Sequence, residues 1–378
     1  MSIPHPEEYR EAVIDLGALK RNVRQLREVI GTDHFLVVVK ANAYGHGMVP
    51  CAHAAIEGGA NWLGVCDVNE ALELRISGVS VPILAWLHAP GETFVEAVQN
   101  NITIGVSSIE QLDALAAAAR AAEVTPVNVH LKLDTGLSRN GAGPDDWDAL
   151  FAHARTLELD NVVHVEGIFS HLSNTSEAID LASADLFDTA LAAAASFGLT
   201  PELIHLAASS TALAYPRMRY NMVRVGITAY GLSPDDAVPA ADLGLTPVMT
   251  LRGQVAAVRR VPAGTGLSYD HLHVTTSEST LALVPLGYAE GVPRSATNTA
   301  PVSLGGKTYT ISGRVAMDQF IVAVGDDAVS VGDEVVLFGD PAQGYPSAAD
   351  WARACGTIGY EIVTRIGGRV THVFAESA

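Results

Sequence analysis

The sequence is short of cysteine and of long apolar runs. Its 378 residues include only three cysteines, Cys51, Cys66 and Cys355, and these form no CxxC pair. Thiols so few and so scattered exclude a disulfide framework and favour a reducing compartment. No apolar run approaches the roughly 20 residues that span a bilayer. The first eight residues carry neither the basic nor the apolar region of a secretory signal, so a cytoplasmic location with no membrane partner is expected.

Positive charge is also scarce. Lysine and arginine number 23 against 42 acidic residues, which gives a net charge of −19. Nucleic acids and anionic membranes select basic surfaces, so neither is an expected partner. The hydrophobic content is 48% and the charged content 17%, which is typical of a well-buried globular protein. The length suffices for two domains.

Short apolar runs rich in strand-forming residues recur through the first 232 residues, at 35–40, 62–67, 82–87, 102–107, 127–134, 162–171, 203–209 and 222–232. Segments of helical character lie between them, at 49–57, 69–77, 90–99, 109–122, 145–157, 181–197 and 210–213. Eight such units in about 200 residues match the size of a (β/α)8 TIM barrel. An open doubly wound sheet is the alternative, but the absence of an obvious reversal favours closure.

The pattern changes after Pro247. Strand-like segments joined by Gly, Pro and Asp turns follow at 251–261, 280–286, 301–311, 314–324 and 329–339, with one helical stretch near 347–354. We therefore predict an α/β protein with an N-terminal barrel, residues 10–243, and a C-terminal mainly-β domain, residues 244–378. The strand-like piece at 9–15 has no partner nearby, so residues 1–9 are candidates for packing with the second domain.

A lysine at the end of the first apolar run is the most unusual feature. Lys40 follows five apolar residues and precedes a glycine-punctuated loop. It is either a side chain reaching solvent or a reactive amine at the mouth of a barrel. The other strand ends add cations and hydroxyl groups, and with Lys40 the set comprises Lys40, Tyr44, Asp67, Lys132, Arg139, His171, Ser209, Arg224 and Gly226.

Several chemistries are excluded by pattern. The strand ends hold no close carboxylate pair, so glycoside hydrolysis is not indicated. His271 and His273 suggest no third ligand, so we expect no metal site. The Gly264-Thr-Gly266 stretch lacks the third glycine and the helix of a dinucleotide fingerprint, and no P-loop is present.

The seventh and eighth units suggest a phosphate site. Backbone N–H groups around Gly226 and the hydroxyl of Ser209 fall where barrels commonly bind phosphate. A phosphate site beside a strand-end lysine suggests pyridoxal 5′-phosphate as cofactor. Turn geometry for Gly226 and a salt bridge for Arg224 are the alternatives for each residue taken alone.

The ordered motifs along nearly the whole chain resemble those of the alanine racemase family. They are Val-Lys40-Ala-Asn-Ala-Tyr44-Gly-His-Gly, Leu-Lys132-Leu-Asp-Thr-Gly-Leu-Ser-Arg139, Gly-Ile-Phe-Ser-His171, Arg224-Val-Gly-Ile-Thr-Ala-Tyr-Gly, Gly-Leu-Ser-Tyr269, Ala-Met317-Asp-Gln and Thr-Ile-Gly-Tyr360-Glu. The resemblance implies a pyridoxal-phosphate enzyme that interconverts L-alanine and D-alanine and supplies D-alanine for peptidoglycan.

The resemblance also assigns the two catalytic bases. Lys40 would carry the cofactor and serve one face of the external aldimine, and Tyr269 would serve the opposite face. A phenol needs support to act as a base near neutral pH. By resemblance His171 and Arg224 provide that support, and Arg224 also faces the pyridine nitrogen of the cofactor.

The remaining site residues are likewise implied by the resemblance. Arg139 and the Met317 backbone would hold the substrate carboxylate. Lys132 matches a position carbamylated in many members, and a plain pair with Asp134 is the alternative. Tyr269 and Met317 would reach the site from a second copy, so a head-to-tail homodimer is expected. The residues placed around the cofactor and its phosphate are Tyr44, His171, Ser209, Arg224, Gly226, Ile227 and Tyr360.

The chain departs from the family pattern at Ala208, Ala316, Glu290 and Gly359. None of these removes a catalytic group, but they affect expectations for cofactor affinity and inhibitor sensitivity. Three other functions compete: a racemase for serine or larger amino acids, a decarboxylase of the same architecture, and a non-catalytic pyridoxal-phosphate protein. The last resembles the barrel alone, so the whole C-terminal region counts against it.

Overall fold

The eight apolar runs form a closed parallel barrel in the computed structural model, which describes residues 9–235 and 237–377. Its strands are short and almost wholly buried, as near-continuous runs of Val, Ile and Leu require when helices cover the outside. The predicted barrel is thereby confirmed, and the open-sheet alternative is wrong. The strands are β2 (His34–Val38), β3 (Trp62–Val65), β4 (Ile83–Ala85), β5 (Thr103–Val106), β6 (Val127–Lys132), β7 (Val163–Phe169), β8 (Leu203–Ala208) and β9 (Met222–Val225).

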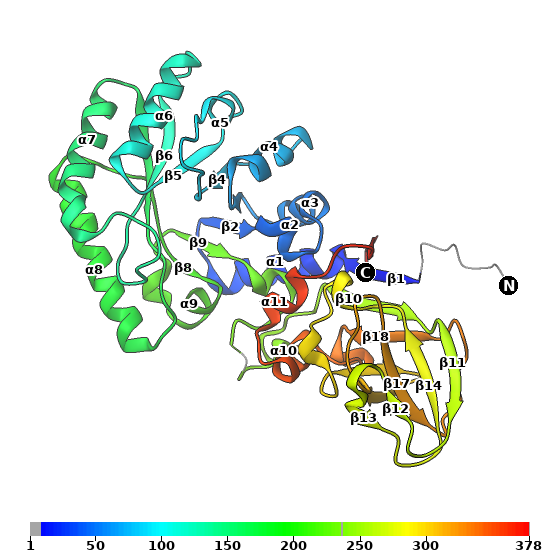
Figure 1. Ribbon diagram of the computed structural model, residues 1–378. Helices are drawn as coiled ribbons and strands as arrows, with labels where there is room; N and C mark the ends of the chain where they lie inside the picture. Colours follow the sequence, from blue (N-terminus) through cyan, green and yellow to red (C-terminus); the bar gives the residue numbers. More distant parts are fainter. Residues whose placement is uncertain (1–8, 236, 378) are drawn as a thin grey trace. The chain divides into compact units, whose positions relative to one another are not determined.

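Helices follow the strands, and Figure 1 shows α7 and α8 covering the outside of the barrel. Several begin where a side chain accepts a hydrogen bond from an early backbone N–H, as Ser108 and Ser176 do. The helices of this part are α1 (Leu16–Ile30), α2 (Lys40–Tyr44), α3 (Met48–Gly58), α4 (Val68–Ile76), α5 (Val95–Gln99), α6 (Ile109–Ala121), α7 (Trp147–Leu159), α8 (Glu177–Ser196) and α9 (Ser209–Ala214).

Two predicted elements are shorter than their patterns suggested. The helix expected at 90–99 is only α5, because Gly91 and Phe94 take positive φ values of 80° and 53°, which a right-handed helix does not allow. The strand expected at 222–232 ends at Val225, and Ile227–Tyr230 is a 3₁₀ turn. Ser209 begins α9 and does not end a strand.

The rest of the chain builds mainly β structure. A six-stranded sheet has the order β16-β15-β18-β10-β1-β19, a three-stranded sheet has the order β11-β14-β17, and β12 pairs with β13. The elements are β1 (Arg10–Asp15), β10 (Met249–Gln254), β11 (Ala257–Val261), β12 (Gly266–Leu267), β13 (His273–Val274), β14 (Ser279–Val284), β15 (Pro301–Leu304), β16 (Lys307–Thr310), β17 (Phe320–Gly325), β18 (Glu334–Phe338), α10 (Ala348–Cys355), α11 (Gly359–Thr364) and β19 (Thr371–Ala375). The run at 251–261 is two strands, and most of 314–319 is loop.

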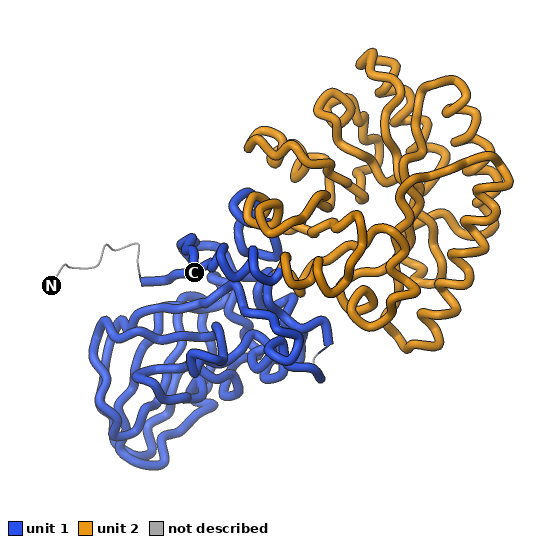
Figure 2. Tube along the Cα trace, turned by 180° about the vertical axis from the view of Figure 1, so that it is seen from behind, with its two compact units in different colours: residues 1–22, 42–51, 230–378 blue, residues 23–41, 52–229 orange. Residues whose placement is uncertain are grey.

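The chain forms two compact units, and each is built from more than one stretch of the sequence. One comprises residues 1–22, 42–51 and 230–378, and the other comprises residues 23–41 and 52–229 (Figure 2). The early strand β1 belongs to the first of these units because it pairs antiparallel with β10 and parallel with β19. Residues 1–8, for which packing with the second domain was expected, lie outside the described residues.

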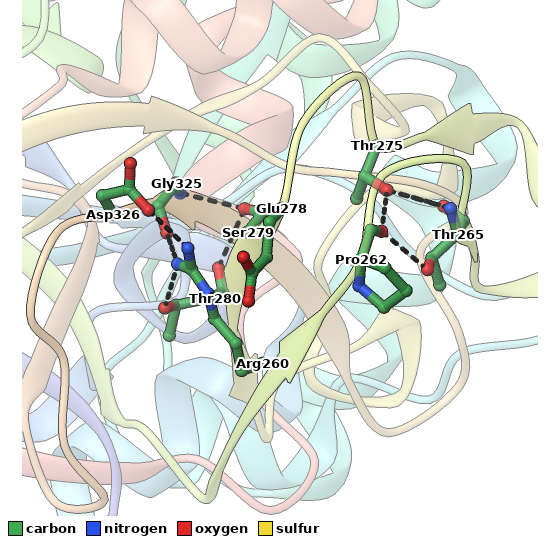
Figure 3. A network of polar contacts seen from close by, with 9 residues as sticks. All are labelled: Arg260, Pro262, Thr265, Thr275, Glu278, Ser279, Thr280, Gly325 and Asp326. Atoms are coloured by element: carbon green, nitrogen blue, oxygen red, sulfur yellow. Dashed lines mark hydrogen bonds and ion pairs between the residues drawn. The ribbon is translucent and has the colours of Figure 1, made fainter.

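Arg260 on β11 ties together the three strands of the smaller sheet (Figure 3). Its guanidinium donates to the carbonyl of Gly325 at 2.7 Å and to the Thr280 hydroxyl at 3.0 Å, and it pairs with Glu278 and Asp326. Nearby, the Thr275 hydroxyl donates to the carbonyl of Pro262 at 2.9 Å, which closes the loop between β11 and β13. These contacts hold the base of the loop that carries Tyr269.

Gly231 offers a test of the packing at the start of the mainly-β unit. Its φ is +77°, and a Cβ there would lie 1.9 Å from the carbonyl oxygen of Thr246. Gly231→Ala should therefore lower the melting temperature by several degrees, since strain and clash together cost more than about 2 kcal/mol. Gly332→Ala, at φ +93° with open space around it, is the matched control and should cost about 1 kcal/mol. Equal shifts for both variants would contradict the close approach.

Candidate functional site

Four cations gather at the carboxyl ends of the barrel strands. Lys132 ends β6, Arg139 follows β6, Lys40 follows β2 and Arg224 lies on β9. After burial, which is the largest cause, the charges of these four lower the pKa of His171 to about 3. The barrel mouth is thus strongly cationic in a protein of net charge −19, and this arrangement suits an anionic ligand.

Lys132 is a buried amine. Its Nζ lies 5.9 Å from the centre of the Phe169 ring. Burial, followed by repulsion from the neighbouring cations, lowers its pKa to about 8. Among the described residues no ion pair joins it to Asp134, whose carboxylate accepts the N–H groups of Gly136 and Ser138 at 3.0 and 3.1 Å. The lowered pKa gives this lysine a larger neutral, nucleophilic fraction near neutral pH than an ordinary lysine has.

The chain leaves Lys40 through a left-handed turn. The φ values of Ala41, Asn42, Ala43 and Tyr44 lie between 52° and 54°, a conformation that costs an L residue about 1–2 kcal/mol each. Strain of this kind persists where the surroundings fix it, and it gathers at functional sites. The Nζ of Lys40 lies 6.0 Å from the Trp86 ring, on the inner side of the barrel mouth.

Arg224 is buried and makes five hydrogen bonds. They reach the carbonyl oxygens of Ser170, His205 and Leu206 and the ring nitrogens of His205 and His171, at 2.7–3.2 Å. Among the described residues none of its contacts is to a carboxylate, and burial lowers its pKa to about 9. The salt bridge considered from the sequence is therefore not the role of this arginine.

His171 is fixed in one tautomer by this arginine. A guanidinium only donates, so the His171 Nδ1, at 3.2 Å from Arg224, must accept. The neutral ring consequently carries its proton on Nε2, which is free to donate to another group. The pKa near 3 keeps the ring uncharged at neutral pH.

Ser209 and the backbone after β9 form a polar cradle. The Ser209 hydroxyl oxygen accepts from the Gly226 N–H at 2.9 Å and from the Thr228 hydroxyl at 3.1 Å. Its own hydrogen is therefore left to donate. Ile227 begins a 3₁₀ turn, and the first N–H of such a turn has no partner within it. Two hydrogen-bond donors, the Ser209 hydroxyl and the Ile227 N–H, thus remain in this buried region and could bind an anionic oxygen.

Tyr44 belongs to the same unit as the β-sheets and packs with two aromatic rings of that unit. The Tyr44 ring lies 5.0 Å from that of Tyr230 and 6.3 Å from that of Tyr360, between ring centroids. Burial, followed by the neighbouring Tyr360, raises the pKa of Tyr44, so its hydroxyl keeps its proton. His46 stabilises the left-handed turn at residues 41–44, since its Nδ1 lies 3.0 Å from the carbonyl oxygens of Ala43 and Tyr44.

Tyr269 stands on a strained, well-anchored turn of the same unit. Its side chain is 67% exposed, which is unusual for a tyrosine. Ser268, Asp270 and His271 all have positive φ values, between 48° and 60°. The Ser268 hydroxyl donates to the Arg314 carbonyl at 2.7 Å, and Arg314 pairs with Asp270 at 2.5 Å. The turn therefore presents the phenol outward in a fixed direction.

Met317 lies on a second exposed loop of this unit, which lines the same hollow as the Tyr269 turn. Its carbonyl accepts from the Ala289 N–H at 2.9 Å, while its own N–H has no hydrogen-bond partner among the described residues. The buried Glu290, one of the departures from the family pattern, accepts from the Gly287 N–H at 2.9 Å and pairs with Arg369. Arg369 also binds Asp318 at 2.5 Å, which steadies the Met317 loop.

Three residues near Arg224 were not predicted to belong to the site. The His205 ring contacts both Arg224 and His130, and His130 contacts Glu166. Two histidines inside otherwise apolar runs were the signal in the sequence, because a buried polar side chain needs a partner. Asp67, expected at a strand end, instead caps α4. The described residues hold no group of acidic, His and Cys side chains able to bind a metal, and none of their helices could cross a membrane.

Family models and curated relatives match nearly the whole chain. The model "Alanine racemase, N-terminal domain" matches residues 14–234, and "Alanine racemase, C-terminal domain" matches residues 248–374. An alanine racemase of Frankia casuarinae is 49% identical over 363 residues, which is 95% of this chain and 94% of that protein. One of Thermobifida fusca is 46% identical, covering 97% and 98%.

Solved structures of alanine racemases also match nearly the whole chain. The crystal structure of alanine racemase from D-cycloserine-producing Streptomyces lavendulae superposes with a TM-score of 0.96 at 45% identity, covering 100% of this chain and 99% of that one. Alanine racemase from Streptomyces coelicolor gives 0.95 at 44% identity, covering 98% of both chains.

Buried neutral histidines should make the protein sensitive to acid. Burial is the first cause that lowers the pKa of His46, His130, His171 and His205. An unfolded histidine titrates near 6.5, so the stability from each neutral ring is present above that pH and is lost as the pH falls. Each ring that stays neutral should lower the free energy of unfolding by about 1.4 kcal/mol per pH unit below 6.5. Urea unfolding at pH 7.5, 6.0 and 5.0 measures this, with exposed His153→Gln as a control that keeps the trend. Equal stability at the three pH values would contradict it.

Proposed function

Because the chain belongs to the alanine racemase family, we propose that it interconverts L-alanine and D-alanine with pyridoxal 5′-phosphate as cofactor. The cationic barrel mouth is the observation that carries the proposal. The charges of Arg224, Arg139 and Lys40 help to lower the pKa of Lys132 there, and all four cations help to lower that of His171. A phosphate and a substrate carboxylate together would balance this charge.

The residues present fit the cofactor. Lys40 offers an amine for its aldehyde. The Ser209 hydroxyl and the Ile227 N–H offer donors for its phosphate, and the Gly226 N–H orients that hydroxyl. Tyr44 and Tyr360 are proposed to lie around the same phosphate. Arg224, a buried cation with no carboxylate, offers a donor to its ring nitrogen. When bound, the cofactor supplies the electron withdrawal that makes the substrate Cα–H acidic.

Two groups of this chain then handle the proton at the substrate Cα. Inversion requires removal on one face and return on the other. Lys40 Nζ is proposed for one face and Tyr269 Oη for the other. Lys40 precedes one strained turn and Tyr269 lies within another. Such turns suit proton-transfer groups, because these groups must be held in a narrow range of positions.

His171 would support the phenol. Its Nε2–H tautomer, fixed by Arg224, provides a donor that stabilises a phenolate oxygen. A neutral imidazole suits this role better than an imidazolium, which would compete to give up its own proton. The low pKa of His171 keeps the ring in the required state.

The substrate carboxylate would be held by Arg139 and by the free N–H of Met317. The guanidinium of Arg139 offers two parallel donors. Tyr269 and Met317 are both exposed, at 67% and 54%, on well-anchored loops that line one hollow. This exposure supports a head-to-tail homodimer in which each copy lends these two residues to its partner's barrel.

Lys132 is proposed to react with carbon dioxide to form a carbamate, which would place a negative charge beside Arg139. Its neutral fraction supports the reaction, since only an uncharged amine attacks. A carbonyl signal from ¹³C-bicarbonate should appear in the native protein, strengthen as the pH rises through 8, and be absent from Lys132→Ala. A spectrum unchanged by that substitution would rule the carbamate out.

Borohydride reduction tests the attachment point. The pyridoxyl label should be found on the peptide containing Lys40, and loss of optical rotation should be seen with L-alanine. Lys307→Ala, at an exposed lysine outside the barrel, is the control that keeps both the label and the activity. Label on another lysine would sink the mechanism, and faster racemisation of L-serine than of L-alanine would assign a different substrate.

Mixing two inactive variants tests the shared site. Lys40→Ala and Tyr269→Phe should each lose at least a thousandfold in kcat, while Tyr269→Phe keeps its cofactor spectrum. Co-refolded mixtures should recover up to a quarter of native turnover per dimer site, because one site in the mixed dimer keeps both bases. Mixed dimers without activity would argue that both bases come from one chain.

The product would serve peptidoglycan synthesis in the cytoplasm, in keeping with the sparse cysteines. Growth of a host lacking this gene only when D-alanine is added would support that role, and growth without D-alanine would contradict it.

A further inference from the structure

We propose that Glu166 is the remote counter-charge of Arg224, acting through His205 and His130 as a one-way chain of hydrogen bonds inside the barrel. The inference deepens the proposed function, on which its effect on turnover rests. The chain consists of Arg224 Nη1 to His205 Nδ1 at 2.8 Å, His205 Nε2 to His130 Nδ1 at 2.9 Å, and His130 Nε2 to Glu166 Oε2 at 3.3 Å.

The end groups determine the direction of every bond. A guanidinium has no acceptor, so His205 Nδ1 must accept and the proton of His205 must lie on Nε2. That proton leaves His130 Nδ1 only the role of acceptor, so His130 also carries its proton on Nε2. A carboxylate only accepts, and this agrees with the last step. One tautomer pair alone satisfies all three bonds.

The rings are held in place and kept neutral by their surroundings. His205 stacks on Phe169 at 4.6 Å with an interplanar angle of 4°, and the two histidines are fully buried. Burial lowers the pKa of both imidazoles, so neither competes with Arg224 for positive charge. Neutral rings in this arrangement are dipoles that all point the same way, with the positive end toward the carboxylate.

Arg224 needs this distant partner because its other contacts are neutral. Its remaining acceptors are three carbonyl oxygens and His171. Glu166 sits at a bulge of β7, where the register shifts, and its side chain is 19% exposed. The carboxylate thus keeps some contact with solvent, while the cation that it balances is buried. Glu166, His130 and His205 are therefore positioning residues for Arg224.

Tautomers provide a readout that does not depend on turnover. In holoenzyme labelled with ¹⁵N at histidine and arginine, long-range ¹H–¹⁵N correlations should report Nε2–H for His130 and His205. His130→Asn offers His205 an oxygen in place of Nδ1 and should keep the His205 tautomer. His130→Leu offers none and should lose it, with displacement of the Arg224 guanidinium resonance. An Nδ1–H form or a charged ring in the native protein would overturn the inference, whatever the activity.

Removing the charge of Glu166 tests its role even if the two His130 variants fail to fold. Glu166→Gln keeps an acceptor but not the charge, so the histidine tautomers should persist while the Arg224 resonance moves. The kcat should fall about tenfold with KM unchanged, which corresponds to about 1.4 kcal/mol. Glu202→Gln removes an exposed charge that also acts on His130 and is the matched control, expected to leave kcat unchanged. An equal response of kcat and of the Arg224 resonance to both substitutions would overturn the role of Glu166.

Discussion

The burial of Arg224 without an adjacent carboxylate is the constraint on which the barrel site depends. An isolated buried cation is costly, and here five neutral acceptors carry its hydrogen bonds. Each histidine that accepts a hydrogen bond from Arg224 through Nδ1 must carry its proton on Nε2. One guanidinium thereby orders two rings, those of His171 and His205. Charge, tautomer and hydrogen-bond direction at the site all follow from this single group.

The mainly-β unit meets a different requirement. The roles proposed for Tyr269 and Met317 require both residues to be exposed and fixed, two conditions that flexible loops rarely satisfy together. Positive φ values and the Arg314–Asp270 pair fix the first residue, and the Arg369–Glu290 pair steadies the loop of the second. Glu290, a departure from the family pattern, has a clear use in this chain, because a buried carboxylate there receives both a backbone N–H and a guanidinium.

The barrel could be read from the sequence because buried parallel strands require continuous apolar runs. The strand-end residues followed from the barrel, since every parallel strand ends at the same mouth. The left-handed turn after Lys40 could not be foreseen, because Ala, Asn and Tyr have no local need for positive φ and only tertiary contacts impose it. The His130–His205 contact was equally hidden, since the two residues are 75 positions apart and each alone looks like an isolated polar residue. The assignment of Tyr269 came from family resemblance, not from pattern.

The pairing of β1 has a consequence for biosynthesis. Asp15 lies opposite Ala375 in a parallel ladder, so this edge of the six-stranded sheet joins residues that are translated far apart in time. At bacterial or eukaryotic elongation rates, roughly 20–70 s separate their appearance at the ribosome. The barrel strands are translated long before that, and so is β10, the other neighbour of β1, while the edge of β1 that pairs with β19 has no partner. An emerging chain therefore presents an unpaired strand edge for most of its synthesis, a period in which chaperones or the ribosome surface would have to shield it.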